Sequence, residues 1–384
     1  MTPLVVVFLR GAADGLNLMV PVDDSVYQDA RPTLALDDTS VLPLDTTFGL
    51  HPAAPRLAER FAAGQVAMVP ACGFDGQSRS HFAAQALLER AEQSGATGWI
   101  GRHLALGAGA TPTPLRAVAV GSVGVPTTLR GTGDVLASTD PTTLGLGVLR
   151  LMRRGQQVGV VPSAMSPSDT DLRRVWSAAG GDGSVHSESA GRLGAAASSA
   201  LDVMERLDGS PFPPVDVADF GEGASAGAFA SAAAVLDAGL GTEVVMVNLG
   251  GWDTHTAQGD GATGAFAGLV GGLDSGIAGL LERFDGSGEP CVMVVTEFGR
   301  RVAENASGGT DHGRGSVAIL AGAGVRGGVH GTWSGLGELD DGDVPAQNSL
   351  SAIQAEVAER VLGSDHVDTV VPSSVGVERL GLFN

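Results

Sequence analysis

The chain has 384 residues, which is enough for one large α/β domain or for two ordinary ones. It carries 43 acidic and 23 basic residues, a net charge of −20, and every basic residue is arginine because lysine does not occur. An acidic surface of this kind repels polyanions, which argues against nucleic acid as a partner. The absence of lysine also excludes catalysis through a Schiff base or a lysine general base.

Short apolar runs, most of them rich in valine, predict buried strands along the chain. They lie at residues 4–9, 66–72, 116–121, 243–249, 291–296 and 317–320. Apolar residues at helical spacing predict helices between them, at residues 52–63, 82–90 and 262–284. This alternation predicts an α/β fold with a doubly wound, mostly parallel sheet and helices on both faces. We expect one domain over residues 1–384, in which residues 122–225 form a less regular insertion or cap.

The two cysteines, Cys72 and Cys291, lie at the edges of apolar runs, so we expect buried thiols, with a long-range disulfide left open. No apolar stretch reaches the roughly 18 residues that span a bilayer, and no signal peptide precedes the first predicted strand. We therefore expect no membrane partner and, as numbered, a cytoplasmic protein.

Acidic and histidine side chains gather where three of the predicted strands end, and in a further glycine-rich motif at residues 309–315. They are Asp14, Asp253, His255, Glu297, Asp311 and His312. Because parallel strands of an open α/β sheet deliver side chains to a ligand crevice at their carboxyl ends, a shared polar site is expected there. Carboxylate and imidazole together favour Zn, Mn or Fe over Ca, which prefers oxygen ligands alone.

Several short motifs give the chain a family resemblance. They occupy residues 8–17, 78–82, 98–102, 250–255 and 296–300, followed by Asn305 and residues 309–313. In this order, over nearly the whole chain, they resemble the domain of unknown function 1501 family, which looks like a divergent branch of the alkaline phosphatase and sulfatase superfamily. The resemblance implies an alkaline-phosphatase-like sheet. Members often carry a twin-arginine export signal, so export by that route is expected if such a signal has been removed from this chain.

The resemblance also implies a function, namely that of a metal-dependent hydrolase or transferase. Its substrate would be a small anionic ester, a phosphate or a related sulfate, and its divalent metal would be Zn or Mn. The implied metal ligands are Asp14, Asp253, His255, Glu297, Asp311 and His312, and the implied catalytic residues are Ser80, His81 and Arg300. The oligomeric state is not indicated.

Two departures from the superfamily pattern bear on this expectation. Glu297 and Phe298 stand where superfamily phosphatases usually have adjacent Asp and His, so one imidazole of a two-metal site is missing. Residues 78–81 lack the proline of the formylglycine motif, which disfavours sulfatase chemistry by that route. The missing imidazole supports an alternative function, a catalytically silent module of this fold that binds a polysaccharide or a partner protein.

Each implied residue also has an ordinary structural role. Ser80 could be only the N-cap of the following helix, worth about 1 kcal/mol, or a nucleophile stabilised by the helix N-terminus. His81 could face solvent in the first turn or act as a general acid. Asp14 could stabilise its glycine-rich turn by an Asx hydrogen bond. Arg300 and Arg314 could clamp an anionic substrate or pair with neighbouring carboxylates.

Overall fold

The computed structural model describes residues 2–76, 78–107, 115–122, 124–132, 135–139, 212–286 and 288–384, and the backbone of two strands at 148–153 and 156–162. Within these residues nine strands form one sheet, in the order β15-β5-β14-β11-β1-β10-β6-β7, with β16 also paired to β5. Their bounds are β1 Leu4–Leu9, β5 Val66–Gly73, β6 Ala117–Val120, β7 Val135–Ser138, β10 Val244–Leu249, β11 Cys291–Thr296, β14 Ser316–Gly322, β15 Gly328–Val329 and β16 Asn348–Ser349.

The sheet is mostly parallel, as the strand and helix alternation predicts. Strand β14 is the exception, because it pairs antiparallel with β11 on one side and with β5 on the other. At the centre, β1 runs parallel to both β10 and β11, in a register that places Leu9 beside Leu249 and Thr296. The carboxyl ends of these three strands therefore lie side by side.

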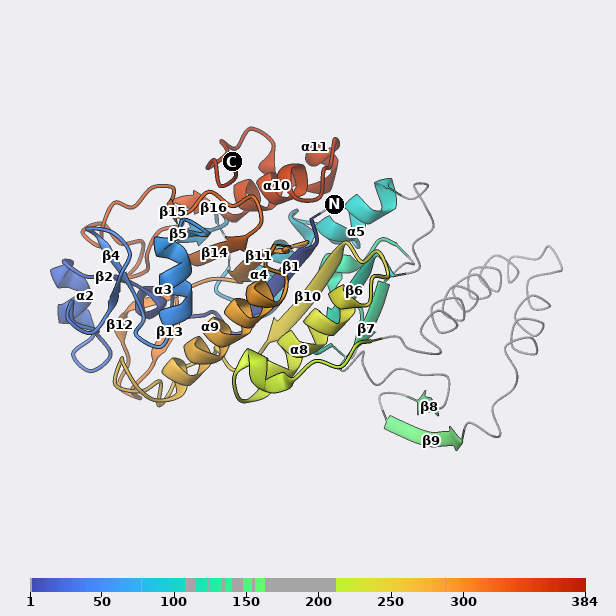
Figure 1. Cartoon of the computed structure of the whole chain (residues 1–384). Coiled ribbons are helices and arrows are strands. Elements are labelled where there is room, and N and C mark those ends of the chain that lie inside the picture. Colours follow the sequence, from blue (N-terminus) through green and yellow to red (C-terminus); the bar gives the residue numbers. More distant parts are fainter. Residues whose placement is uncertain are drawn as a thin grey trace.

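Helices cover both faces of the sheet (Figure 1). The core on one face contains side chains of α3 Pro55–Ala62, α8 Ala224–Asp237 and α9 Ala265–Arg283. The other core contains side chains of α4 His81–Arg90, α5 Trp99–Leu106, α10 Leu350–Arg360 and α11 Val367–Val370. Alternate residues of β1 belong to alternate cores, since successive side chains of a strand point to opposite faces. The structure thereby confirms a mixed α/β fold with a mostly parallel central sheet and helices on both faces.

Smaller elements surround this sheet. They are the sheet of β2 Met19–Pro21, β3 Leu42–Pro43 and β4 Phe48–Leu50, the hairpin of β12 Arg300–Glu304 and β13 Thr310–His312, the pair β8 Val148–Arg153 and β9 Gln156–Pro162, the short helices α1 Gly15–Leu18 and α2 Ser25–Ala30, and the 3-10 turns η1 Thr127–Leu129, η4 Val217–Phe220 and η5 Pro372–Ser374. The insertion or cap predicted at residues 122–225 falls largely outside the described residues and stays a prediction.

Helix α9 differs from one sequence expectation. By length and composition alone it is apolar enough to cross a membrane, because small and apolar residues fill most of its 19 positions. The sequence had led us to expect no such stretch. It is 61% buried inside the protein, where it packs against α8 and α3. The same features describe the core helix of a sheet protein.

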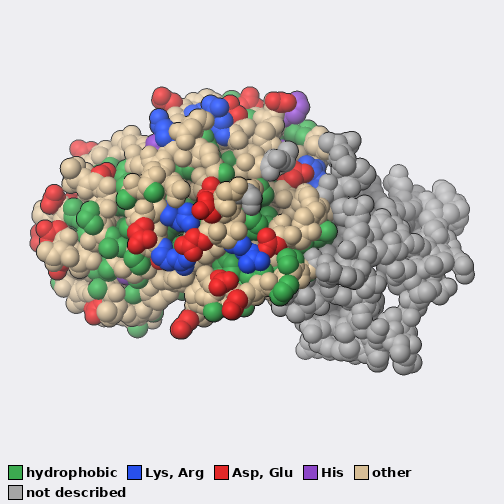
Figure 2. All heavy atoms as spheres, viewed as in Figure 1, with side chains coloured by type: hydrophobic (Ala, Val, Ile, Leu, Met, Phe, Trp, Pro, Cys, Tyr) green, Lys and Arg blue, Asp and Glu red, His purple; other side chains and the backbone are tan. Residues whose placement is uncertain are grey.

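The described surface and core agree with the composition. Acidic side chains are spread over the face seen in Figure 2, with fewer basic ones among them. Cys72 and Cys291 are both buried and unbonded to each other, as expected for core thiols. Burial raises the pKa of Cys291 to about 12 and raises that of Cys72 as well, so neither thiol is activated as a nucleophile.

Candidate metal centre

Four segments meet where β1, β10 and β11 end. The loop after β10 carries Asp253 and His255, and Glu297 follows β11 directly. The hairpin of β12 and β13 ends at His312, and the first residue of α4 is His81. The fold thus brings together side chains that are more than 200 positions apart in the sequence.

Three imidazoles point the same nitrogen toward one place. The Nε2 atom of His312 lies 3.0 Å from Nε2 of His81 and 2.9 Å from Nε2 of His255. The carboxylate of Asp253 completes the group, with Oδ1 at 3.2 Å from Nε2 of His255 and 3.3 Å from Nε2 of His312. The donor atoms of His81, Asp253 and His312 all lie within 4.8 Å of one another, and His255 borders them.

The opposite nitrogen of each ring faces an oxygen that can only accept a hydrogen bond. The Nδ1 partners are Oε1 of Glu297 for His81 at 2.7 Å, Oδ1 of Asp311 for His255 at 3.1 Å, and the backbone carbonyl of Arg79 for His312 at 3.0 Å. In a neutral imidazole each Nδ1 therefore carries the hydrogen and each Nε2 keeps a lone pair. Three lone pairs and a carboxylate then face one another.

The carboxylates around the histidines are held in their ionised form. Burial opposes the ionisation of Glu297, but hydrogen bonds from Gln85 and His81 outweigh it and lower the pKa. At Asp253 burial is likewise outweighed by the hydrogen bond and charge of Arg300, so the pKa is lowered. The pKa of Asp311 is lowered by hydrogen bonds from Asn305 and His255.

This donor set fits a divalent metal ion. Donor atoms around Zn at about 2.1 Å would lie about 3.4 Å apart in a tetrahedral arrangement, close to the 3.3 Å between His312 Nε2 and Asp253 Oδ1 and the 3.6 Å between His81 Nε2 and Asp253 Oδ2. Burial lowers the pKa of His312, which favours the neutral imidazole that binds metal. The side chains of His81, His312 and Asp253 are 26%, 24% and 49% exposed, so the group is open to solvent on one side. As ligands, His81, Asp253 and His312 would leave one position of a tetrahedral ion open, as is usual in catalytic zinc sites.

Glu297 and Asp311 lie behind the imidazoles, which differs from their expected role as ligands. Glu297 is fully buried, and its Oε1 also accepts hydrogen bonds from the backbone N–H of Gly11 and from Gln85. Carboxylates in this position fix the tautomer and the orientation of metal-binding histidines. Gln85 was not singled out in the sequence, where an amide in mid-helix has no distinguishing pattern.

His81 also takes a different place from the one expected. Predicted as a general acid, it instead contributes one of the converging nitrogens. Ser80 occupies the N-cap position of α4, but its side chain makes no capping hydrogen bond and is exposed. The Ser80 side chain therefore does not cap the helix by a hydrogen bond, although this was one of its expected roles.

Arg300 is fully buried, so it does not face a substrate as a clamp would. Its guanidinium donates to the backbone carbonyls of Ala12 and Thr310, each at 2.6 Å, and to Oδ1 of Asp253 at 2.7 Å. It thereby ties the loops after β1 and β10 to the β12–β13 hairpin. Arg314, the other candidate clamp, pairs with Asp340 at 3.0 Å.

Asp14 lies outside the metal-binding group, although it follows β1 as predicted. Its Oδ2 accepts hydrogen bonds from Arg31 and Gln258, both at 2.7 Å, and the Asp14 and Arg31 side chains are fully buried. The positive charge of Arg31 balances the carboxylate without a metal ion. Arg31 lies in a segment that the sequence motifs did not mark.

Comparison with known proteins gives one match. A family model described as a protein of unknown function (DUF1501) matches residues 187–372. No curated protein matches the chain. The matched segment contains Asp253, His255, Glu297, Asp311 and His312, whereas Asp14 and His81 precede it. Over residues 187–372 the chain is thus similar to the DUF1501 family, and the wider resemblance to alkaline phosphatases stays a prediction.

Proposed function

We propose that this protein is a metal-dependent hydrolase or transferase acting on a phosphate ester or a related sulfate ester. The observation that carries the proposal is the group of His81, Asp253 and His312, whose donor atoms lie within 4.8 Å of one another, with His255 Nε2 2.9 Å from His312 Nε2 and an oxygen acceptor at every Nδ1. Neighbouring Nε2 lone pairs with no hydrogen between them repel one another unless a cation lies beside them. Zinc suits three imidazoles and one carboxylate best, and Mn is the second choice.

The surrounding residues would prepare this centre. Glu297 and Asp311 hold two of the imidazoles with Nε2 unprotonated, and Arg300 fixes the carboxylate of Asp253. Removal of such orienting partners typically lowers metal affinity or activity by about 10–100-fold. When bound, a divalent ion would polarise an ester oxygen and lower the pKa of a nearby hydroxyl or water.

Ser80 is the candidate nucleophile. It immediately precedes His81, its side chain is exposed, and it makes no capping hydrogen bond. It also stands at the N-terminus of α4, where unpaired backbone N–H groups and the helix dipole favour an alkoxide and a tetrahedral anion. The likeness of the sequence motifs to the alkaline phosphatase superfamily is what favours a phosphate or sulfate ester over other substrates.

Hydrolysis of an aryl phosphate in the presence of Zn or Mn tests the proposal. The Ser80→Ala variant should lose activity by at least about 100-fold while keeping its metal, since the hydroxyl would be the attacking group. Its melting temperature should change little, because no capping bond is lost. Ser78→Ala is the matched control, since its hydroxyl accepts a hydrogen bond from the backbone of Ser80 and should matter far less.

Two results would speak against the proposal. Full activity in Ser80→Ala would remove the serine from the mechanism. A metal-loaded parent protein that hydrolyses no phosphate or sulfate ester would instead favour the silent binding module, because the metal centre would then serve a structural or binding role.

A further inference from the structure

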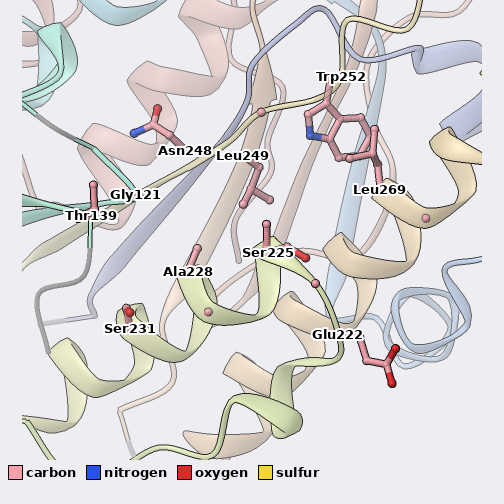
Figure 3. A pocket seen from close by; sticks show the side chains of 15 residues that line it. Gly121, Thr139, Glu222, Ser225, Ala228, Ser231, Asn248, Leu249, Trp252 and Leu269 are labelled. Carbon is pink, nitrogen blue, oxygen red and sulfur yellow. The ribbon is translucent and has the colours of Figure 1, made fainter. Parts of the chain in front are cut away.

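A cavity of about 460 Å³ lies next to the metal centre at the carboxyl end of β10. It is bounded by the first two turns of α8, the first turn of α9 and the loop that leads to Asp253 (Figure 3). Its size lies within the range of about 300–1,000 Å³ that is usual for small-molecule sites. The metal-binding side chains do not line it, so it is a separate compartment.

The described side chains that line the cavity are mostly small and uncharged, and they are partly apolar and partly polar. Glycine and alanine make up about half of it, with Leu249 and Leu269 as apolar walls and Ser225, Ser231 and Asn248 as polar groups. Neither arginine nor histidine is among the described residues that line it. Among the described lining residues Glu222 is the one with a charged side chain, and Figure 3 shows its carboxylate directed away from Leu249 and Ser225. A neutral ligand with hydroxyl groups matches this chemistry better than an anion does.

Trp252 supplies a polar group that lacks a partner. The side chain is 1% exposed, and its indole nitrogen has no hydrogen-bond partner among the described residues. Figure 3 shows this nitrogen on the edge of the ring that faces Leu249 and the cavity. Because a buried N–H without a partner costs roughly 1–3 kcal/mol, a displacement of the ring that brings this N–H to a ligand oxygen in the cavity would remove that penalty.

The cavity and the metal centre are joined by a short exposed stretch of backbone. Trp252 lines the cavity and the next residue, Asp253, belongs to the metal-binding group. Gly250 and Gly251 are exposed, and a Cβ placed on Gly250 would meet no atom within 4 Å. Gly250 and Asp253 can lie at most about 11 Å apart, so one small ester could reach from one compartment to the other.

We propose that this cavity binds a neutral, hydroxylated group of about the size of a monosaccharide. Combined with the proposed function, on which this step rests, the substrate would be a phosphate ester of a sugar or similar polyol. Its ester group would lie at the metal centre, and its neutral part would lie against Trp252 and the start of α8.

Two glycines allow the cavity to be filled without strain. Gly227 in α8 and Gly268 in α9 both line the cavity, and a Cβ added at either would meet no atom within 4 Å. Leucine favours a helix more than glycine does, so Gly227→Leu and Gly268→Leu should fold at least as well as the parent. Ala265→Leu is the matched control, because residue 265 is exposed on α9 and does not line the cavity.

Binding of glucose, mannose and galactose is then measured by calorimetry and saturation-transfer NMR on the metal-loaded protein. At least one of these sugars should bind the parent and the Ala265→Leu control, with affinity reduced tenfold or more in Gly227→Leu and Gly268→Leu. Trp252→Phe, which removes only the N–H and part of the ring, should weaken binding to a smaller degree. Binding that persists in both leucine variants, or no binding of any of the three sugars to the parent, would overturn the inference.

The same samples separate this inference from the proposed function. Aryl phosphate hydrolysis without sugar binding would contradict the proposed sugar site and support the proposed hydrolase function. Sugar binding without hydrolysis of any ester would leave the cavity as a sugar site and remove the hydrolase. If both hold, kcat/KM for a sugar phosphate should fall tenfold or more in Gly227→Leu relative to Ala265→Leu.

Discussion

Two clusters of polar side chains follow the ends of neighbouring strands, and they differ in how their charges are balanced. After β1, the carboxylate of Asp14 is paired with Arg31, and both side chains are fully buried. After β10, the carboxylate of Asp253 faces the lone pairs of His255 and His312, in a group that is partly exposed. The carboxylate of the first cluster has a buried arginine and no imidazole beside it, whereas that of the second lies between Arg300 and the histidine nitrogens. A carboxylate at a strand end therefore indicates a metal site where imidazole nitrogens lie beside it, whether or not an arginine also contacts it.

Gln258 links the two clusters. Its amide N–H donates to Asp14, and its carbonyl oxygen accepts hydrogen bonds from Thr254 and Thr310. Thr254 lies between Asp253 and His255 in the metal-binding loop. Changes at Arg31, at Glu297 and at Gln258 can therefore separate the roles of the two clusters.

The largest effect is expected from Arg31→Met, which leaves the buried carboxylate of Asp14 without its cation. Loss of one partner of a buried pair typically costs about 3–5 kcal/mol, so the free energy of unfolding should fall by that amount in urea or guanidinium titration. The double variant Asp14→Asn, Arg31→Met should recover part of the loss, because the unpaired charge is gone. Recovery of stability by added Zn alone would show instead that Asp14 binds metal.

The next effect is expected from Glu297→Gln, which keeps the size of the side chain but removes the charge that orients His81. Metal affinity measured by competition with a chelator should fall by about 10–100-fold. Glu304→Gln is a suitable control, since the hydrogen bonds that the Glu304 carboxylate accepts come from Thr33 and Leu34. Unchanged metal affinity in Glu297→Gln would contradict the orienting role.

A smaller effect is expected from Gln258→Leu, which removes the link between the clusters. The hydroxyls of Thr254 and Thr310 would lose a buried acceptor, so stability should fall by roughly 1–3 kcal/mol. Metal affinity should fall as well, because the loop that carries Asp253 and His255 is less well held. Gln258→Glu keeps an acceptor oxygen but places a second carboxylate against the buried Asp14, so it should not regain the stability. A loss of stability in Gln258→Leu with metal affinity intact would mean that the two clusters are independent.

The smallest effect is expected from pH, at His51. This buried imidazole accepts a hydrogen bond from the N–H of Ala53 and donates one to the carbonyl of Gly261, and burial lowers its pKa. The unfolded chain binds this proton at about pH 6.5, and the folded chain only at lower pH. Stability should therefore fall as pH drops below about 6.5, and His51→Gln should weaken that fall. Denaturant titrations of the metal-free protein across pH 5–8 measure it, and an equal pH dependence in both proteins would exclude His51.

Much of the fold follows from sequence patterns. The apolar runs of β1, β10 and β11 correctly predict three strands of the sheet, because continuous apolar runs are typical of parallel strands buried on both faces. The segments after these runs correctly mark where the strands end. The antiparallel direction of β14 could not be predicted, since a buried run reads the same in both directions.

The sequence predicted several residues of the candidate site, but it predicted the role of each residue less well. Asp253, His255 and His312 stand in motifs rich in glycine, and the structure brings them together. The places of Asp14 and Glu297 depend on Arg31, which is 17 positions from Asp14, and on Gln85, which is 212 positions from Glu297. The place of His81 depends on the start of α4. Whether a carboxylate binds metal or orients a histidine is decided by such neighbours, which local patterns do not contain.

The most direct test of the metal centre is metal content and coordination, measured on protein purified without chelators or metal-affinity resin. Inductively coupled plasma analysis and X-ray absorption should show one divalent ion per chain after loading with Zn, bound by about three imidazole nitrogens at roughly 2.0–2.1 Å. His312→Ala should lose that ion, while His366→Ala, at an exposed position outside the site, should keep it. A parent protein that binds neither Zn nor Mn, or a His312→Ala variant that retains the ion with the same coordination, would contradict the account.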